Sequence, residues 1–159
     1  MVGCSFLSEL PKIQPQAKTT GFTVSSFTMQ SMHPGVEMNL WKTVTYRIEI
    51  DALFPEGSHN FELFVTVKGI PSKDTGFVIN LKELGDILKN GVIEKIDHKN
   101  INLDVDFMSG KMSSTENLVI GIWEQIEKDI LNLGGELAKI KLVETENNFV
   151  EYFGGKEPF

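Results

Sequence analysis

Two stretches of alternating apolar and polar residues constrain the fold of this chain more than any other feature. The first runs from Val44 to Ala52, where every second residue is apolar and the residues between are polar or charged. The second, from Phe61 to Lys68, repeats the pattern. A period of two is typical of a strand with one buried and one solvated face. Because the segment 54–57 (Phe-Pro-Glu-Gly) between them has turn-forming chemistry, we expect an antiparallel pair.

Two amphipathic helices are predicted after this pair. Asn80 is a suitable N-cap for the first helix, which we expect to end near residues 90–91 (Asn-Gly). A capping box of Ser113 and Glu116 is expected to begin the second helix, which should end at residues 134–135 (Gly-Gly). The apolar stripes are Leu81, Leu84, Ile87 and Leu88 in the first helix, and Leu118, Ile122, Ile126 and Ile130 in the second.

Two further strands, Leu137–Val143 and Phe149–Tyr152, complete the pattern. The order strand, strand, helix, helix, strand, strand predicts an α+β fold, in which an antiparallel sheet (ββααββ) carries two helices on one face. We assign residues 21–155 to a single domain, with an extra strand segment within residues 21–40. Prolines and polar residues predict an irregular arm over residues 1–20.

Composition excludes several classes of partner. The formal net charge is −7, and the 15 basic residues are scattered, so we expect no nucleic-acid partner. No apolar run approaches the roughly 18 residues of a membrane span, and residues 1–10 lack the features of a signal peptide. We therefore expect a cytoplasmic protein without a membrane partner. The single cysteine, Cys4, excludes an internal disulfide.

Three short polar motifs occur in a fixed order, each where a predicted element begins or ends. They are residues 96–100 (Ile-Asp-His-Lys-Asn), 113–117 (Ser-Ser-Thr-Glu-Asn) and 143–148 (Val-Glu-Thr-Glu-Asn-Asn). Together with the segment 76–81 (Gly-Phe-Val-Ile-Asn-Leu), they resemble the 6-pyruvoyltetrahydropterin synthase family and its relative, the 6-carboxytetrahydropterin synthase of the queuosine pathway. The resemblance extends from His59 to Tyr152.

The resemblance implies a unit called the T-fold, whose sheets join edge to edge in a trimer to form a barrel, two trimers often stacking as a hexamer. Closure also has a general physical motive, since an open sheet leaves backbone groups unpaired at its edges. We therefore expect a homo-oligomer that binds a small-molecule pterin. The implied activity is that of a carbon–oxygen lyase of tetrahydrobiopterin or queuosine biosynthesis, acting on 7,8-dihydroneopterin triphosphate.

The resemblance also assigns roles to four residues. Glu144 corresponds to the glutamate that binds the 2-amino-4-oxopyrimidine edge of the pterin, because a carboxylate can accept two parallel N–H bonds. Asp97 and His98 match a catalytic pair that moves protons, since a neighbouring carboxylate can hold the tautomer of an imidazole. Thr115 lies ahead of the second helix, where hydroxyl and N–H groups can meet a polar ligand. Simpler roles stay open: a water-facing acid for Glu144, and a cap after the first helix for Asp97 and His98. Around Thr115, the capping box already explains Ser113 and Glu116 without a ligand.

The zinc site of that family is incomplete in this sequence. The family uses one histidine on its first strand and a His-Gly-His pair opening its second, three imidazoles that leave one position of tetrahedral zinc open. Here the pair reads Gly-Ser-His over residues 57–59, so only His59 is kept. The first-strand position falls at Ile50, or at Ser26 in an alternative alignment. Residues that could complete a site with His59 are His33, Asp51 and Glu56.

The nucleophilic cysteine of the family has no counterpart either. The only cysteine is Cys4, and Glu56, a possible substitute, lies about two residues closer to His59 than the family pattern requires. Three interpretations stay open: a pterin synthase that uses zinc, a non-catalytic or repurposed zinc-free relative that binds a pterin or purine, and an oligomeric scaffold whose motifs serve as caps and turns.

Overall fold

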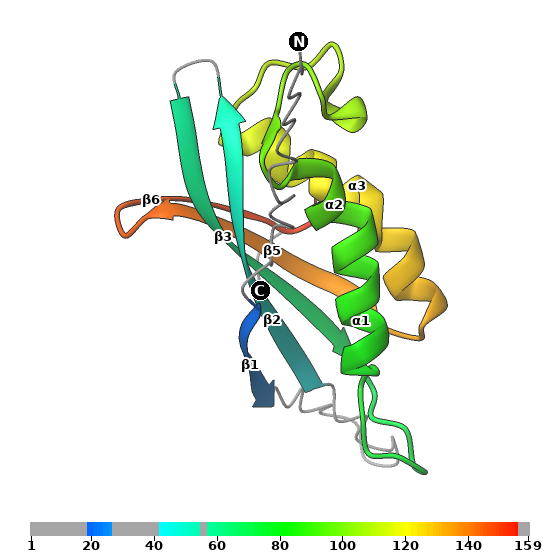
Figure 1. Cartoon of the computed structure of the whole chain (residues 1–159). Helices are drawn as coiled ribbons and strands as arrows, with labels where there is room; N and C mark the ends of the chain where they lie inside the picture. The colour runs from blue at the N-terminus through cyan, green and yellow to red at the C-terminus, as the bar shows by residue number, and fades with distance from the viewer. Residues whose placement is uncertain (1–18, 27–41, 55–56, 156–159) are drawn as a thin grey trace, which may run out of the picture.

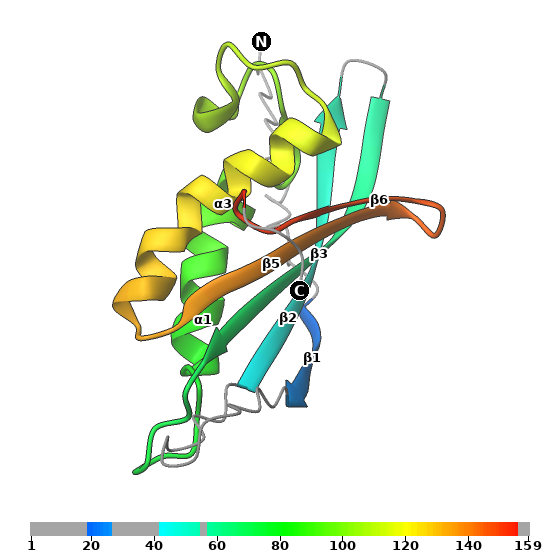
Figure 2. The ribbon, with the colours of Figure 1, turned by 180° about the vertical axis from the view of Figure 1, so that it is seen from behind.

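The molecule has two layers, a sheet and a set of helices that covers one of its faces (Figures 1 and 2). The computed structural model describes residues 19–26, 42–54 and 57–155. The two helical segments lie between the second and third strands of the predicted ββααββ order, so the predicted α+β fold is confirmed. Closure into a barrel by oligomerisation stays a prediction.

Five strands follow one another across the sheet in the order β1-β2-β3-β5-β6, and each neighbouring pair is antiparallel. Their bounds are Thr19–Ser26 (β1), Lys42–Phe54 (β2), Gly57–Gly69 (β3), Glu136–Thr145 (β5) and Asn148–Tyr152 (β6). The alternating stretches pair as predicted, with Val44 opposite Val67 and Ile50 opposite Phe61. β1 lies partly in the N-terminal segment of residues 21–40 and begins at Thr19, within the arm predicted to be irregular. The remainder of that arm, with Cys4, and residues 27–40 of the predicted extra strand segment lie outside the described residues.

A short sixth strand makes the sheet mixed. β4 (Lys99–Asn100) runs parallel to β2 and pairs with Ala52 and Leu53. β1 occupies the same edge of β2 only as far as Ile48. Along this edge of β2, residues 49–51 therefore lie between the part that pairs with β1 and the part that pairs with β4.

The first helical segment is longer than the sequence predicted. α1 (Leu81–Leu88) begins at the expected N-cap, where the Asn80 side chain accepts a hydrogen bond from the N–H of Lys82 at 3.0 Å. A π-helix, η1 (Lys89–Ile93), and α2 (Glu94–Ile96) then continue the run, so the predicted end at residues 90–91 is wrong. Gly91 serves close packing instead of capping: a Cβ there would lie 3.3 Å from Cγ2 of Ile126.

The second helical segment begins one residue later than predicted. α3 (Thr115–Asn132) has Ser114 as its N-cap, whose hydroxyl accepts a hydrogen bond from the N–H of Asn117 at 3.2 Å. The predicted Ser113–Glu116 capping box is therefore wrong. The predicted end is confirmed, since Gly134 follows with a φ of +85° and donates its N–H to the carbonyl of Leu131 at 3.0 Å. A 3-10 turn, η2 (Asp106–Met108), lies between α2 and α3.

The core lies between the helices and one face of the sheet. Leu84 and Leu88 of α1 are fully buried, as are Ile122, Ile126 and Ile130 of α3. They pack against the inward residues of the strands, among them Ile48, Ile50, Leu63, Val65, Ile140 and Leu142. This burial holds the C-terminal end of α2 against the edge of β2, next to the candidate residues Asp97 and His98. None of the helices in the described part of the chain is long and apolar enough to span a bilayer.

Candidate functional site

The backbone of Asp97 and His98 is fastened to the edge of β2. After the helical run ends at Ile96, the N–H of His98 donates to the carbonyl of Asp51 at 2.6 Å. The Asp97 carboxylate accepts a hydrogen bond from the N–H of Asp51 at 3.1 Å. Both backbone polar groups of Asp51 are thus satisfied by this pair, which places Asp97 and His98 in the gap between β1 and β4.

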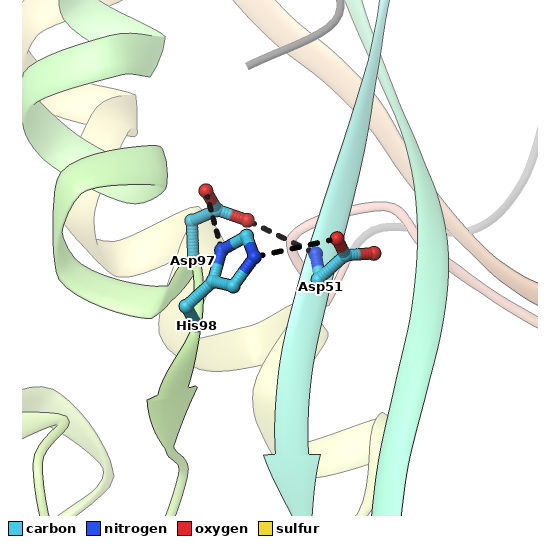
Figure 3. Close-up of side chains that lie close together, drawn as sticks. All are labelled: Asp51, Asp97 and His98. Atoms are coloured by element: carbon cyan, nitrogen blue, oxygen red, sulfur yellow. Dashed lines mark hydrogen bonds and ion pairs between the residues drawn. The ribbon is translucent and has the colours of Figure 1, made fainter. Parts of the chain in front are cut away.

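The imidazole of His98 lies between two carboxylates (Figure 3). Its Nδ1 is 3.0 Å from Oδ2 of Asp97, and its Nε2 is 3.7 Å from Oδ2 of Asp51. The Asp97 side chain is only 12% exposed, whereas that of His98 is 59% exposed. A proton on Nδ1 faces the sheltered Asp97, so the exposed Nε2 is the ring atom suited to exchange a proton with a ligand.

His98 adopts a backbone conformation that is uncommon for a residue with a side chain. Its φ is +57°, and it is the only residue other than glycine with a positive φ in the described ranges. The left-handed region costs an L-residue roughly 1–2 kcal/mol, although His, Asn and Asp enter it more readily than most. Strain of this kind is concentrated at functional sites. Here it turns the chain from α2 into β4 while the imidazole stays beside β2.

Glu144 lies at an irregularity near the end of β5. Val143 pairs with Phe149 and Thr145 pairs with Asn148, so Glu144 is an extra residue on β5, a β-bulge. Bulges of this kind redirect side chains at the margins of sheets and next to active sites. The bulge occurs within the motif of residues 143–148. Because of it, the direction of the Glu144 side chain does not follow the regular alternation of the strand.

Two side chains hold the Glu144 carboxylate. Nδ1 of His59 makes a short hydrogen bond to Oε1, and the Asn148 amide donates to Oε2. The ring of His59 also packs edge-on against Phe54 with 5.2 Å between the centroids, which fixes it at the start of β3. The side chains of His59 and Glu144 are 25% and 19% exposed. Because an ionised carboxylate has about four acceptor positions, the two contacts leave about two for a ligand.

One open cavity of about 560 Å³ brings the two predicted groups of residues together. Asp97 and His98 reach it from the edge of β2, and Glu144 reaches it from the end of β5. The described residues that line it are Glu49, Asp51, Asn60, Phe61, Glu62, Asp97, His98, Val143, Glu144, Thr145 and Glu146. We call this the main cavity. Its volume lies in the range of cavities that take small organic molecules.

Among the described residues, only His59 corresponds to the three histidines implied for zinc. Ile50 is 2% exposed in the apolar core, so the first-strand position cannot supply a ligand. The side chain of the alternative, Ser26, lies outside the described part of the chain, as do His33 and Glu56. His59 already directs Nδ1 to Glu144. Asp51, Asp97 and His98 each offer one ligand atom, and these three atoms lie within 4.8 Å of one another, so they could hold a small cation. In the structure, however, the three residues form ion pairs and a hydrogen bond with one another.

The remaining site predictions have different outcomes. Thr115 is half-buried as the first residue of α3, and it is not among the described residues that line the main cavity. Asn148 was contained in the predicted motif, but its contact with Glu144 was not predicted. Asp51 was considered only as a metal ligand, and its pairing with Asp97 and His98 could not be predicted, because it depends on the parallel contact between β2 and β4.

Comparisons with known proteins agree with the motifs. A family model described as 6-pyruvoyl tetrahydropterin synthase matches residues 57–155. The 6-pyruvoyl tetrahydrobiopterin synthase of Dictyostelium discoideum is 44% identical over 96 residues, which cover 60% of this chain and 69% of that protein. The human protein of the same name is 39% identical over 101 residues, which cover 63% of this chain and 68% of that protein.

A solved structure supports the fold. The 6-pyruvoyl tetrahydropterin synthase of Caenorhabditis elegans matches with a TM-score of 0.66 at 23% sequence identity, over 72% of this chain and 96% of that one. This likeness confirms the T-fold. The segment matched by the family model contains His59, Asp97, His98 and Glu144, whereas Asp51 precedes it.

Proposed function

The chain belongs to the 6-pyruvoyl tetrahydropterin synthase family, and from that premise we propose that it binds a pterin in the main cavity and moves protons on it with His98. One observation carries the proposal: Glu144 and the Asp97–His98 pair, 46 residues apart, line the same cavity. The order of the strands across the sheet provides this proximity, because β3 alone separates β2 from β5.

Glu144 anchors the ring in this proposal. The 2-amino group and the neighbouring ring N–H of a pterin form a planar pair of donors that matches the two acceptor positions left on the carboxylate. His59 and Asn148 are positioning residues, since they fix the plane of the carboxylate before a ligand arrives. A preorganised acceptor lowers the entropic cost of binding.

His98 is the proton-transfer group. Nε2 takes a proton from the side-chain carbon next to the ring of the bound pterin, and the electron pair of the broken C–H bond passes into the conjugated ring. The nearby Asp97 carboxylate stabilises the imidazolium that forms. A positioned general base contributes typically 10²–10⁴-fold to a rate. Since the described residues supply only His59 of the three histidines implied for zinc, we derive no step through a metal.

A second candidate is a pterin- or purine-binding protein that does not catalyse. The observation in its favour is that residues 57–59 read Gly-Ser-His and that His59 is committed to Glu144. The two candidates share the pocket and differ in turnover. Incubation of the purified protein with dihydroneopterin compounds, followed by chromatography of the products, separates them.

Substitution of Glu144 tests the shared part of the proposal. Glu144→Gln and Glu144→Ala each remove charge-assisted hydrogen bonds worth about 1.5–3 kcal/mol apiece, so affinity for a pterin should fall by about 100-fold or more. Fluorescence titration with the purified protein measures it, and light scattering checks that assembly is unchanged. Glu151→Gln, the same chemical change in the exposed Lys139–Glu151 pair of the β5–β6 hairpin, is the matched control. Unaltered affinity in both Glu144 variants would remove this residue from the site.

A further inference from the structure

The described side chains of the main cavity offer many hydrogen-bond acceptors and few donors. Six of them are carboxylates, which accept hydrogen bonds when ionised and donate none. Only three of the described side chains that line it carry an N–H or O–H group to donate, namely those of Asn60, His98 and Thr145. A pterin presents groups of both kinds, because its 2-amino and ring N–H groups donate and its 4-oxo oxygen accepts. Glu144 can hold the donors of this edge, so the neighbouring oxo oxygen needs a donor from elsewhere in the cavity.

Asn60 lies next to the β2 side of the cavity. It is part of β3 and pairs with Asp51 of β2. Residues directly opposite in an antiparallel pair point to the same face, with Cβ atoms about 4.5–5.5 Å apart. The Asp51 carboxylate in turn lies 3.7 Å from Nε2 of His98. Asn60 is therefore on the cavity face of the sheet, near the ring atom proposed for proton transfer.

Asn60 is also level with the anchor on β5. Glu62 pairs with Val143, and β3 and β5 are antiparallel, so Asn60, two residues before Glu62, lies opposite the bulge that follows Val143. Glu144 is the extra residue of that bulge. Because β3 alone separates β2 from β5, a ring that is held by Glu144 and reached by His98 passes over Asn60.

The side-chain amide of Asn60 is uncommitted. Asn60 is exposed, and its amide makes no hydrogen bond with another residue in the part of the chain that the structure describes. The other two donors differ from it: His98 is held between Asp97 and Asp51 and serves proton transfer, and Thr145 has a single hydroxyl. The Asn60 amide has two N–H donors in one plane, which suits the planar edge of a pterin.

We propose that Asn60 binds the 4-oxo group of the pterin through an N–H of its side-chain amide. The inference rests on the proposed function and adds a recognition residue to the same site. Glu144 and Asn60 then divide the pyrimidine edge between them, because the carboxylate accepts from its donors and the amide donates to its oxo oxygen. A ligand that loses the second hydrogen bond leaves this oxygen unpaired in the cavity, and an unpaired polar group weakens binding.

Asn60→Asp tests the proposal, because it keeps the shape of the side chain and replaces both N–H donors by an acceptor. Affinity for 7,8-dihydroneopterin should fall by about tenfold or more, since two acceptors then face each other. The 4-amino analogue of the same compound presents a donor at that position, so its affinity should fall by less than about twofold. Fluorescence titration of the whole chain with each compound measures both. The hydrogen bonds that Glu144 loses with the analogue are lost equally with and without the substitution, so they cancel in the comparison.

Two further variants separate hydrogen bonding from charge and shape. Asn60→Leu, which is close in size and has no polar group, should also weaken binding of dihydroneopterin, by about fivefold. Asn102→Asp makes the same chemical change at an exposed position outside the described lining of the cavity and should alter neither affinity. Unaltered affinity for dihydroneopterin in both Asn60 variants, or equal losses for the two compounds in Asn60→Asp, would overturn the inference.

The outcome also separates the inference from the function on which it rests. If Glu144→Gln abolishes binding of dihydroneopterin and the Asn60 variants leave it unchanged, the pterin site stands and the role of Asn60 falls. If dihydroneopterin does not bind the unsubstituted chain, the proposed function falls and this inference falls with it.

Discussion

Because the backbone of His98 is left-handed, we expect its glycine and alanine variants to rank in stability in the reverse of the usual order. At most positions, glycine destabilises a protein relative to alanine by about 0.5–1 kcal/mol, because it has more conformational freedom to lose on folding. At His98, where φ is +57°, alanine keeps the steric cost of the left-handed region and glycine removes it. We therefore expect His98→Gly to be more stable than His98→Ala.

The size of the difference follows from two opposing terms. Relief of the left-handed conformation favours glycine by roughly 1–2 kcal/mol. The greater freedom of the unfolded chain opposes it by about 0.4–1 kcal/mol. The contacts of the imidazole with Asp97 and Asp51 are lost equally in both variants, so they cancel in the comparison. The net advantage of glycine is about 1 kcal/mol, or a shift of roughly 2–4 °C in the melting temperature for a chain of this size.

Urea unfolding measures this difference at a single protein concentration, since assembly would make apparent stability depend on concentration. Lys99 provides the matched control, because it is the exposed next residue and its φ is not positive. There, Lys99→Gly should be less stable than Lys99→Ala. The same order at both positions, with alanine favoured, would refute the left-handed conformation of His98. Neither His98 variant keeps the imidazole, so both should lose the proposed proton transfer.

Two further predictions concern the beginning of α3. Ser114→Ala should lower the free energy of unfolding by about 1 kcal/mol through loss of the N-cap, whereas Ser113→Ala should change it by less than about 0.5 kcal/mol. Equal effects of the two substitutions in urea unfolding would contradict the assignment of Ser114 as the N-cap. The pKa of Glu116 is lowered below its ordinary value of 4.5, first by a hydrogen bond from its own backbone N–H and second by one from the hydroxyl of Ser114. The ionised carboxylate therefore contributes to the free energy of unfolding above pH 4.5, and this contribution is lost as the pH falls through the lower folded pKa. Glu116→Gln should therefore destabilise by less than about 1 kcal/mol at neutral pH, after allowance for solvent screening, and a cost that persists near pH 2 in thermal unfolding would contradict this assignment.

The strands were predictable because their signal is local and repeated. Alternation over residues 44–52 and 61–68 specifies which face is buried, and a slip of one residue would expose the whole apolar set. The stripes of the two helices were equally clear. The errors arose where one residue type serves two purposes. Gly91 is the usual residue after a helix, yet here it permits close approach to Ile126, a contact between positions 35 residues apart.

The site was only partly predictable, for a different physical reason. The motifs identified Asp97, His98 and Glu144 individually, but their common cavity depends on the sheet order β2-β3-β5, which a linear sequence does not state. The bulge at Glu144 and the left-handed conformation of His98 carry no periodic signal. Both are local departures from regular structure that surrounding contacts impose, and such departures are expected at functional sites.

The contact between β2 and the Asp97–His98 pair joins residues inside and outside the segment that the family model matches. Asp51 precedes the segment matched by the family model, while the residues it touches lie inside it. Two of its three contacts use its backbone N–H and carbonyl, and those groups are available whatever side chain occupies the position. The positions of Asp97 and His98 therefore require only that a strand pass here in this register. The Asp51 side chain, which adds a second carboxylate beside Nε2 of His98, is consequently a feature of this chain that the pairing itself does not demand.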